Sequence, residues 1–206
     1  MAKPHIAFPL QEETTDVVLR GPRRPERCGD WIQTASGVQF WPLDPRPEDI
    51  RLDDIATALS KICRWGGHID AEGIFSVAQH SCLVAMHVEW RFKKQALLHD
   101  AHEAYIFDAP RPVKRYLINY DIIALRLDAA IGDRFGIELV DLPGEVKAAD
   151  ERSLATERRD LIVRTDWELT GAQGGRVMPW PGKIACWEPE QARRAFLGLA
   201  WRLGIR

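Results

Sequence analysis

The sequence has none of the marks of a secreted, membrane-spanning or zinc-knuckle protein. Its four cysteines are widely scattered and form no C-x-x-C pair, which disfavours a zinc or dithiol motif and favours reduced thiols. No stretch approaches the ~20 apolar residues of a membrane span. The first ten residues are interrupted by Pro4 and Pro9 and hold no apolar core of signal-peptide length. We therefore expect a cytoplasmic protein without a membrane partner.

Neither sign of charge dominates the chain. Its 28 Lys and Arg residues stand against 30 Asp and Glu residues, a net charge of −2. No global field therefore draws the protein to nucleic acid, which we do not expect as a partner. The basic, proline-interrupted residues 20–27 are a local exception, and we interpret them as a solvated arm. With 206 residues, 46% of them hydrophobic, the chain can bury a core without disulfides.

The spacing of apolar residues predicts an all-α fold with a short N-terminal hairpin. Residues 37–43 alternate between turn signals, which indicates a small strand or hairpin with Trp41 and Leu43 on one face. From residue 49 the period becomes helical. The predicted helices cover residues 49–62, 76–90, 93–106, 118–135, 143–167 and 189–203, and residues 171–182 form a loop. We divide one globular unit into an extension, residues 1–48, and a main domain, residues 49–206.

Five acidic and imidazole side chains carry the chemical signal: His80, His99, Asp100, Glu103 and Asp150. His99 and Asp100 follow an apolar run, where burying an imidazole beside a carboxylate is costly unless a divalent cation compensates. Their donor atoms suit zinc, manganese, cobalt or iron. Glu103 follows both by one helical turn. Alone, His80 would be a core histidine and Asp150 a first-turn residue favoured by the helix dipole. The ordered set changes that interpretation.

The set His80, His99-Asp100 and Asp150 resembles the H…HD…D signature of the HD-domain metal-dependent phosphohydrolases. The run Val-Lys-Ala-Ala-Asp-x-x-x-Leu-x-x-Glu around Asp150 strengthens the resemblance. It implies an HD-domain helical bundle in which these four side chains hold one divalent metal: zinc, cobalt, manganese or iron. It leaves open a further Mg²⁺ on the substrate phosphates.

Further segments are similar to the 5′-deoxynucleotidase branch of that superfamily. Residues 99–104 and 108–114 resemble its H-D-x-x-E and D-x-P-x-P-x-K motifs, and Arg64-Trp65 resembles its Arg-Trp pair. Residues 34–50 are similar instead to the opening of a phage-associated and bacterial HD group, which includes enzymes acting on deoxyadenosine nucleotides.

The resemblance implies a role for each candidate site residue. Glu103 orients the water or handles the proton passed to the leaving oxygen, and Asp108 accepts from the 3′-hydroxyl. Trp65 crowds the 2′ position, which favours deoxyribose, while Arg64 binds phosphate through its planar fork. The remaining candidates are Lys114 as a second phosphate contact, and Trp41 and Leu43 as a frame for the base.

The expected activity is hydrolysis of the 5′-phosphate ester of 2′-deoxynucleotides, with mono- and triphosphates both open and adenine as the expected base. The resemblance also implies a homo-oligomer. Two alternatives remain: another HD phosphoesterase, such as a guanosine tetraphosphate hydrolase or a phosphodiesterase, or a non-catalytic nucleotide sensor. Cyclic-dinucleotide cleavage is disfavoured, because Ala101-His102-Glu103 follows the HD pair where that class has a Gly-Tyr-Pro extension. We interpret His102 as a surface or supporting residue that faces away from the ligands, and His87 as structural.

Overall fold

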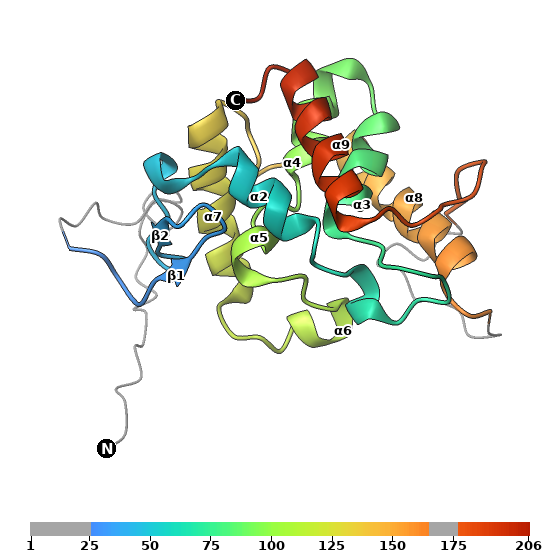
Figure 1. Cartoon of the computed structure of the whole chain (residues 1–206), viewed down its shortest axis with the longest axis horizontal. Helices are drawn as coiled ribbons and strands as arrows, with labels where there is room; N and C mark the ends of the chain where they lie inside the picture. Colours follow the sequence, from blue (N-terminus) through green and yellow to red (C-terminus); the bar gives the residue numbers. More distant parts are fainter. Residues whose placement is uncertain (1–25, 165–176) are drawn as a thin grey trace.

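The fold is mostly helical with one small hairpin, as the sequence predicts. The computed structural model describes residues 26–164 and 177–206 (Figure 1). In these ranges the helices are η1 (Pro47–Asp49), α2 (Leu52–Leu59), η2 (Arg64–Gly67), α3 (Val77–Met86), η3 (Trp90–Phe92), α4 (Lys93–Leu98), α5 (Glu103–Ile106), α6 (Arg111–Lys114), α7 (Tyr120–Phe135), α8 (Gly144–Leu161) and α9 (Pro189–Arg202). None of them has the length and apolarity that crossing a bilayer requires.

Helix α3 lies at the centre of the bundle. It packs against α4, α8 and α9, and α9 also covers α2 (Figure 1). Of its residues, only Leu83 and Met86 are not fully buried. A helix enclosed on nearly every side belongs to the core, where each large apolar side chain contributes about 1.5–3 kcal/mol by leaving water. His80 therefore sits in the interior of the molecule.

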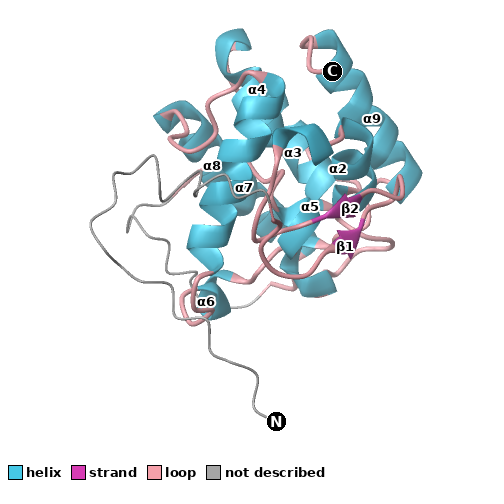
Figure 2. Ribbon diagram, turned by 90° about the vertical axis from the view of Figure 1, so that its left-hand side faces the viewer, coloured by secondary structure: helices cyan, strands magenta, loops and turns pink. Residues whose placement is uncertain are grey.

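The predicted hairpin is confirmed, with strands of two residues each. β1 (Ile32–Gln33) pairs antiparallel with β2 (Gln39–Phe40). The ring of Phe40 is fully buried and stacks on Tyr105 of α5, with 3.9 Å between centroids. At the turn, the buried Asp54 of α2 accepts bonds from the Ser36 backbone N–H and hydroxyl at 2.6 and 2.7 Å. These contacts hold the hairpin beside α2 and α5 (Figure 2). The division at residue 48 stays a prediction.

Two helices end earlier than their apolar pattern predicts. α3 ends at Met86 rather than near residue 90. His87 Nδ1 donates a hydrogen bond to the Leu83 carbonyl at 2.9 Å, which is the acceptor that the His87 backbone N–H would use in a continuing helix. α8 ends at Leu161 rather than near residue 167. The Asp70 backbone N–H donates a hydrogen bond to the Leu161 carbonyl at 2.6 Å. Residues 165–167 lie outside the described ranges. In both cases a competing donor satisfies a carbonyl at the helix end.

The helix predicted over residues 93–106 is wrong as a single element, because α4 and α5 are separate. His99 Nδ1 donates to the Ala96 carbonyl at 2.8 Å, which occupies the acceptor that Asp100 N–H would use in a continuous α-helix. The backbone tightens accordingly: Ala101 N–H bonds to Leu98 O, and Glu103 N–H to Asp100 O. These two bonds span three residues each, as in a 3₁₀-helix, and they lie around His99 and Asp100.

The ends of α2, α7 and α9 agree with prediction to within three residues. At the end of α7, Gly136 adopts the predicted left-handed cap with φ 66°. One turn earlier Gly132 permits a close approach, because a Cβ there would lie 2.5 Å from the Ile137 carbonyl oxygen.

The contact between Asp54 and Ser36 generates a prediction. Replacing the buried Asp54 with Ala removes the charged acceptor of two hydrogen bonds from Ser36, so we expect the free energy of unfolding to fall by about 1–3 kcal/mol. Asp53→Ala is the matched control, since this neighbouring carboxylate is 77% exposed and pairs with Arg193 at 3.6 Å. Urea unfolding of both variants measures the difference; equal losses would contradict the anchoring role of Asp54.

Candidate metal centre

Two histidine rings meet between α3, α4 and α8. His80 Nε2 and His99 Nε2 are 3.3 Å apart, and both side chains are buried. Asp150 of α8 places Oδ1 3.2 Å from His80 Nε2. Asp100 Oδ2 lies 3.1 Å from His99 Nε2 and 3.4 Å from His80 Nε2. One ligand atom from each of His80, His99 and Asp150 lies within 4.8 Å of the others, so this group could hold a metal ion.

Local backbone bonds bring Arg64 next to the start of α3. The Arg64 N–H bonds to the Phe75 carbonyl at 2.9 Å, part of a short antiparallel bridge between the two segments. Ser76 then caps α3, as the sequence predicts, because its side chain accepts from Gln79 N–H at 3.2 Å. His80 follows one turn inside the helix, which sets its depth in the core.

A fully buried carboxylate, Glu157, supports His80 from behind. Its Oε1 lies 2.8 Å from His80 Nδ1 and accepts from the Ser153 hydroxyl at 2.8 Å. Its Oε2 accepts from Arg64 Nε at 3.1 Å and Trp65 Nε1 at 2.9 Å. Burial alone would raise the pKa of Glu157, but the charges of Arg64 and His80 outweigh it and hold that pKa well below its ordinary value. Glu157 therefore stays ionised and aligns the imidazole.

The donor set fits a divalent cation. The Nδ1 atoms of both histidines face acceptors, Glu157 Oε1 and the Ala96 carbonyl, so both Nε2 atoms point at the shared centre. Burial and Arg64 act to lower the pKa of His80, yet the nearby carboxylates outweigh them and raise it. Protons on both Nε2 atoms would repel across 3.3 Å. A single dication satisfies the two nitrogens and the carboxylates together.

Glu103 and Asp108 lie close enough to this centre for its charged groups to affect their pKa values. Glu103 is buried, and within the described residues its Oε2 has no hydrogen-bond partner. Burial, followed by the charges of Asp100 and Asp108, raises the pKa of Glu103 well above its ordinary value. Asp108 follows Phe107, whose φ of 75° is unusual for a non-glycine residue. The Tyr120 hydroxyl bonds to the Phe107 carbonyl at 2.7 Å and holds this turn.

Other sequence-predicted site residues have contacts elsewhere. Lys114 Nζ lies 3.9 Å from Asp121 and 4.8 Å from the Tyr120 ring centroid, against the start of α7. The Trp41 ring lies under the Arg27 guanidinium at 4.6 Å, and Leu43 packs beside Gly29. These contacts place Trp41 and Leu43 in the packing of the N-terminal segment.

Two interpretations from the sequence change in the structure. Of the two alternatives for His102, a surface residue is wrong, because the side chain is 7% exposed and its Nδ1 pairs with Asp128 of α7 at 3.0 Å. Arg27 is not solvated, since it binds the Asp44 carbonyl and the Asp49 carboxylate. The partners of both side chains come from tertiary contacts, which an apolar pattern cannot reveal. Residues 20–25 lie outside the described ranges. His87 stacks on Trp180 at 3.8 Å, which agrees with a structural role.

Sequence reasoning missed Arg111, and it included Glu157 only as the last residue of the run around Asp150, without a role. Glu157 lies seven residues after Asp150, two turns along the same face of α8, and this spacing is the signal that identifies it. Arg111 Nη2 lies 3.7 Å from Asp150 Oδ2. It occupies an unspecified position of the D-x-P-x-P-x-K run, so the motif gave no signal for it.

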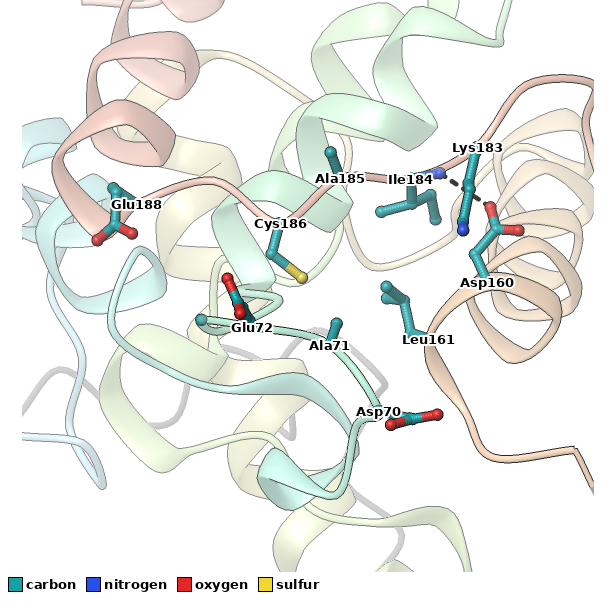
Figure 3. A pocket seen from close by; sticks show the side chains of 11 residues that line it. Asp70, Ala71, Glu72, Asp160, Leu161, Lys183, Ile184, Ala185, Cys186 and Glu188 are labelled. Atoms are coloured by element: carbon teal, nitrogen blue, oxygen red, sulfur yellow. Dashed lines mark hydrogen bonds between the residues drawn. The ribbon is translucent and has the colours of Figure 1, made fainter.

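A separate cavity of about 500 Å³ lies between residues 70–73, the end of α8 and residues 183–188 (Figure 3). Its lining carries four carboxylates and one ammonium group, from Asp70, Glu72, Asp160, Glu188 and Lys183. Asp160 is already engaged, because it pairs with Arg159 and accepts from the Ile184 N–H. None of the candidate metal ligands is among the described residues that line this cavity.

Fold and site define a mostly helical protein with a His-His-Asp group that could hold a metal ion, its two imidazoles buried. No family model matches the sequence. The chain is 44% identical over 131 residues to the uncharacterized protein YfdR of Escherichia coli K12. The aligned region spans 64% of this chain and 72% of YfdR. The chain therefore belongs to the same family as YfdR. It is also 38% identical over 127 residues to the uncharacterized protein RCAP_rcc00048 of Rhodobacter capsulatus, covering 58% of this chain and 64% of that relative.

The support from Glu157 generates a prediction about metal affinity. In Glu157→Gln the neutral amide no longer holds the charge of His80 and Arg64, so we expect metal affinity to fall by about 10–100-fold. Glu151→Gln is the matched control on the same helix, because Glu151 is only partly buried. Competition with a chromophoric chelator measures both variants. Wild-type affinity in Glu157→Gln would show that the imidazole needs no such support.

Proposed function

We propose that this protein is an HD-type metal-dependent phosphohydrolase that cleaves the 5′-phosphate ester of 2′-deoxynucleotides. The observation that carries the proposal is the convergence of His80, His99, Asp100 and Asp150 on one point. These residues come from separate segments in the order of the H…HD…D signature. A structural helix bundle has no need to gather two imidazoles and two carboxylates in its interior.

The chemistry of the donor set fits hydrolysis of a phosphoester. When bound, a divalent cation at such a site acts as a Lewis acid toward the phosphoryl group and makes water more acidic. The chain supplies the rest of the arrangement. Glu157 and the Ala96 carbonyl fix the two imidazole orientations, and the aligned rings need no reorganisation when substrate arrives.

Two side chains beside the ligands are proposed to act on the substrate. Arg64 has Nη1 3.6 Å from Asp100, so a phosphate at the metal ligands lies within reach of its guanidinium. Glu103 lies one turn beyond the ligands with an unpartnered carboxyl oxygen, where it can orient water or pass a proton to the leaving 5′-oxygen.

The sugar contacts follow from the same region. Trp65 is fixed by its bond to Glu157, in a left-handed conformation with φ 58°. We propose that its ring crowds the 2′ position while Asp108 accepts from the 3′-hydroxyl. An adenine preference and a homo-oligomer stay predictions from the resemblance, and a cytoplasmic location stays a prediction from the composition of the sequence. Lys114, Trp41 and Leu43 stay untested as substrate contacts.

Phosphorus NMR tests the proposal directly. The metal-reconstituted protein is incubated separately with dAMP, dATP and ATP. Inorganic phosphate from dAMP alone would identify a monophosphate 5′-nucleotidase, whereas free triphosphate from dATP would identify a triphosphohydrolase. If no substrate yields product although metal is bound, the deoxynucleotide proposal is wrong and another phosphoester or a sensing role takes its place.

Two substitutions separate the ligands from the proton-handling group. Asp150→Ala removes a carboxylate that faces both imidazoles, so we expect loss of both metal and activity. Glu103→Gln keeps the size of a side chain outside the ligand set, so we expect full metal content and a loss of turnover of about 10²–10⁴-fold. Elemental analysis and the phosphorus assay measure both. Unchanged turnover in Glu103→Gln would refute its role, and full metal content in Asp150→Ala would remove Asp150 from the ligands.

A further inference from the structure

The candidate metal centre opens to solvent on the side of its carboxylates. The His80 and His99 side chains are 0% and 5% exposed, whereas those of Asp100 and Asp150 are 17% and 26% exposed. A molecule that approaches a cation held here therefore passes the two carboxylates. Positive side chains at this opening are the ones that an anionic substrate meets.

Arg111 stands at this opening. Its Nη2 lies 3.7 Å from Asp150 Oδ2, and its side chain is 57% exposed. The segment that carries it is stiff, because Pro110 and Pro112 restrict φ on either side and the Val113 N–H bonds to the Pro110 carbonyl at 2.8 Å. A stiff backbone lowers the entropy cost of holding a ligand at this position.

Arg64 and Lys114, two further positively charged side chains of this region, are less exposed than Arg111 and pair with other residues. Arg64 is 12% exposed and already bound to Glu157, with Nη1 3.6 Å from Asp100. Lys114 lies against Asp121 and Tyr120 on α7. Arg111, by contrast, presents a planar fork of N–H donors to solvent beside the ligand carboxylates.

We propose that Arg111 forms a second anion subsite, which binds the outer phosphates of a linear triphosphate beyond the phosphate that reacts. The inference rests on the proposed function and narrows its substrate to triphosphates. Its basis is electrostatic: a dication held at the centre would neutralise Asp150, so Arg111 would lose its counterion and could pair with a bound anion instead. A terminal phosphate lies several ångströms beyond the reacting ester, on the open side where Arg111 stands.

Binding of inorganic anions tests this subsite without any turnover. Isothermal calorimetry on the metal-loaded, full-length protein compares inorganic triphosphate with orthophosphate. In Arg111→Ala we expect triphosphate binding to weaken by about 10–100-fold, the usual effect of losing charge-assisted hydrogen bonds. Orthophosphate binding should change by less than about twofold, because a single phosphate at the metal ligands does not reach the subsite.

Arg115→Ala is the matched control. It removes the same charge from the same segment, at a guanidinium that lies over the Tyr116 ring at 4.9 Å, and it should leave both anions bound as in the wild type. Arg111→Lys keeps the positive charge beside Asp150 but removes the planar guanidinium. If Arg111→Ala lowers metal content, Arg111→Lys therefore tests the anion subsite in its place. A partial loss of triphosphate binding in Arg111→Lys is the expected result.

Three results would overturn the subsite. They are unchanged triphosphate binding in Arg111→Ala and Arg111→Lys, an equal loss for both anions, and an equal loss in Arg115→Ala. Failure of the proposed function looks different: the wild type would bind triphosphate through Arg111 but hydrolyse no deoxynucleotide.

Discussion

The buried carboxylate of Glu157 is the interaction on which the candidate site depends. It has no exposed surface, and it joins His80, Arg64, Trp65 and Ser153 through its two oxygens. An isolated charge at such depth would be strongly destabilising, so the partners are required by the fold as well as by the site. One side chain of α8 thereby fixes the orientation of an imidazole on α3 and the place of the Arg-Trp pair before it.

The fold was largely predictable because its helices follow the 3.6-residue period of apolar side chains. α7 and α9 show this clearly, with Gly136 and Pro189 marking their ends. The errors share one physical cause. His87, His99 and Asp70 each supply a donor to a helix carbonyl, and such competition depends on tertiary placement rather than on periodicity.

The candidate site was predictable to a similar degree, for a different reason. Candidate metal ligands carry their chemistry in their identity, so His80, His99, Asp100 and Asp150 stand out in the sequence. Supporting residues such as Glu157 and Arg111 act through position, and their residue types are common on protein surfaces. Only the folded chain shows that one is buried behind an imidazole and that the other faces a ligand carboxylate.

The candidate ligand residues belong to three segments that are distant along the chain, namely α3, the turn after α4, and α8. Residues 80 and 99 are 19 positions apart, and 50 further positions separate residues 100 and 150. A group that binds all of them ties these segments together and exists only in the folded chain. A cation bound there would link metal occupancy to conformational stability, so that the cation supply of the cell would help to set how long this protein persists in its native form.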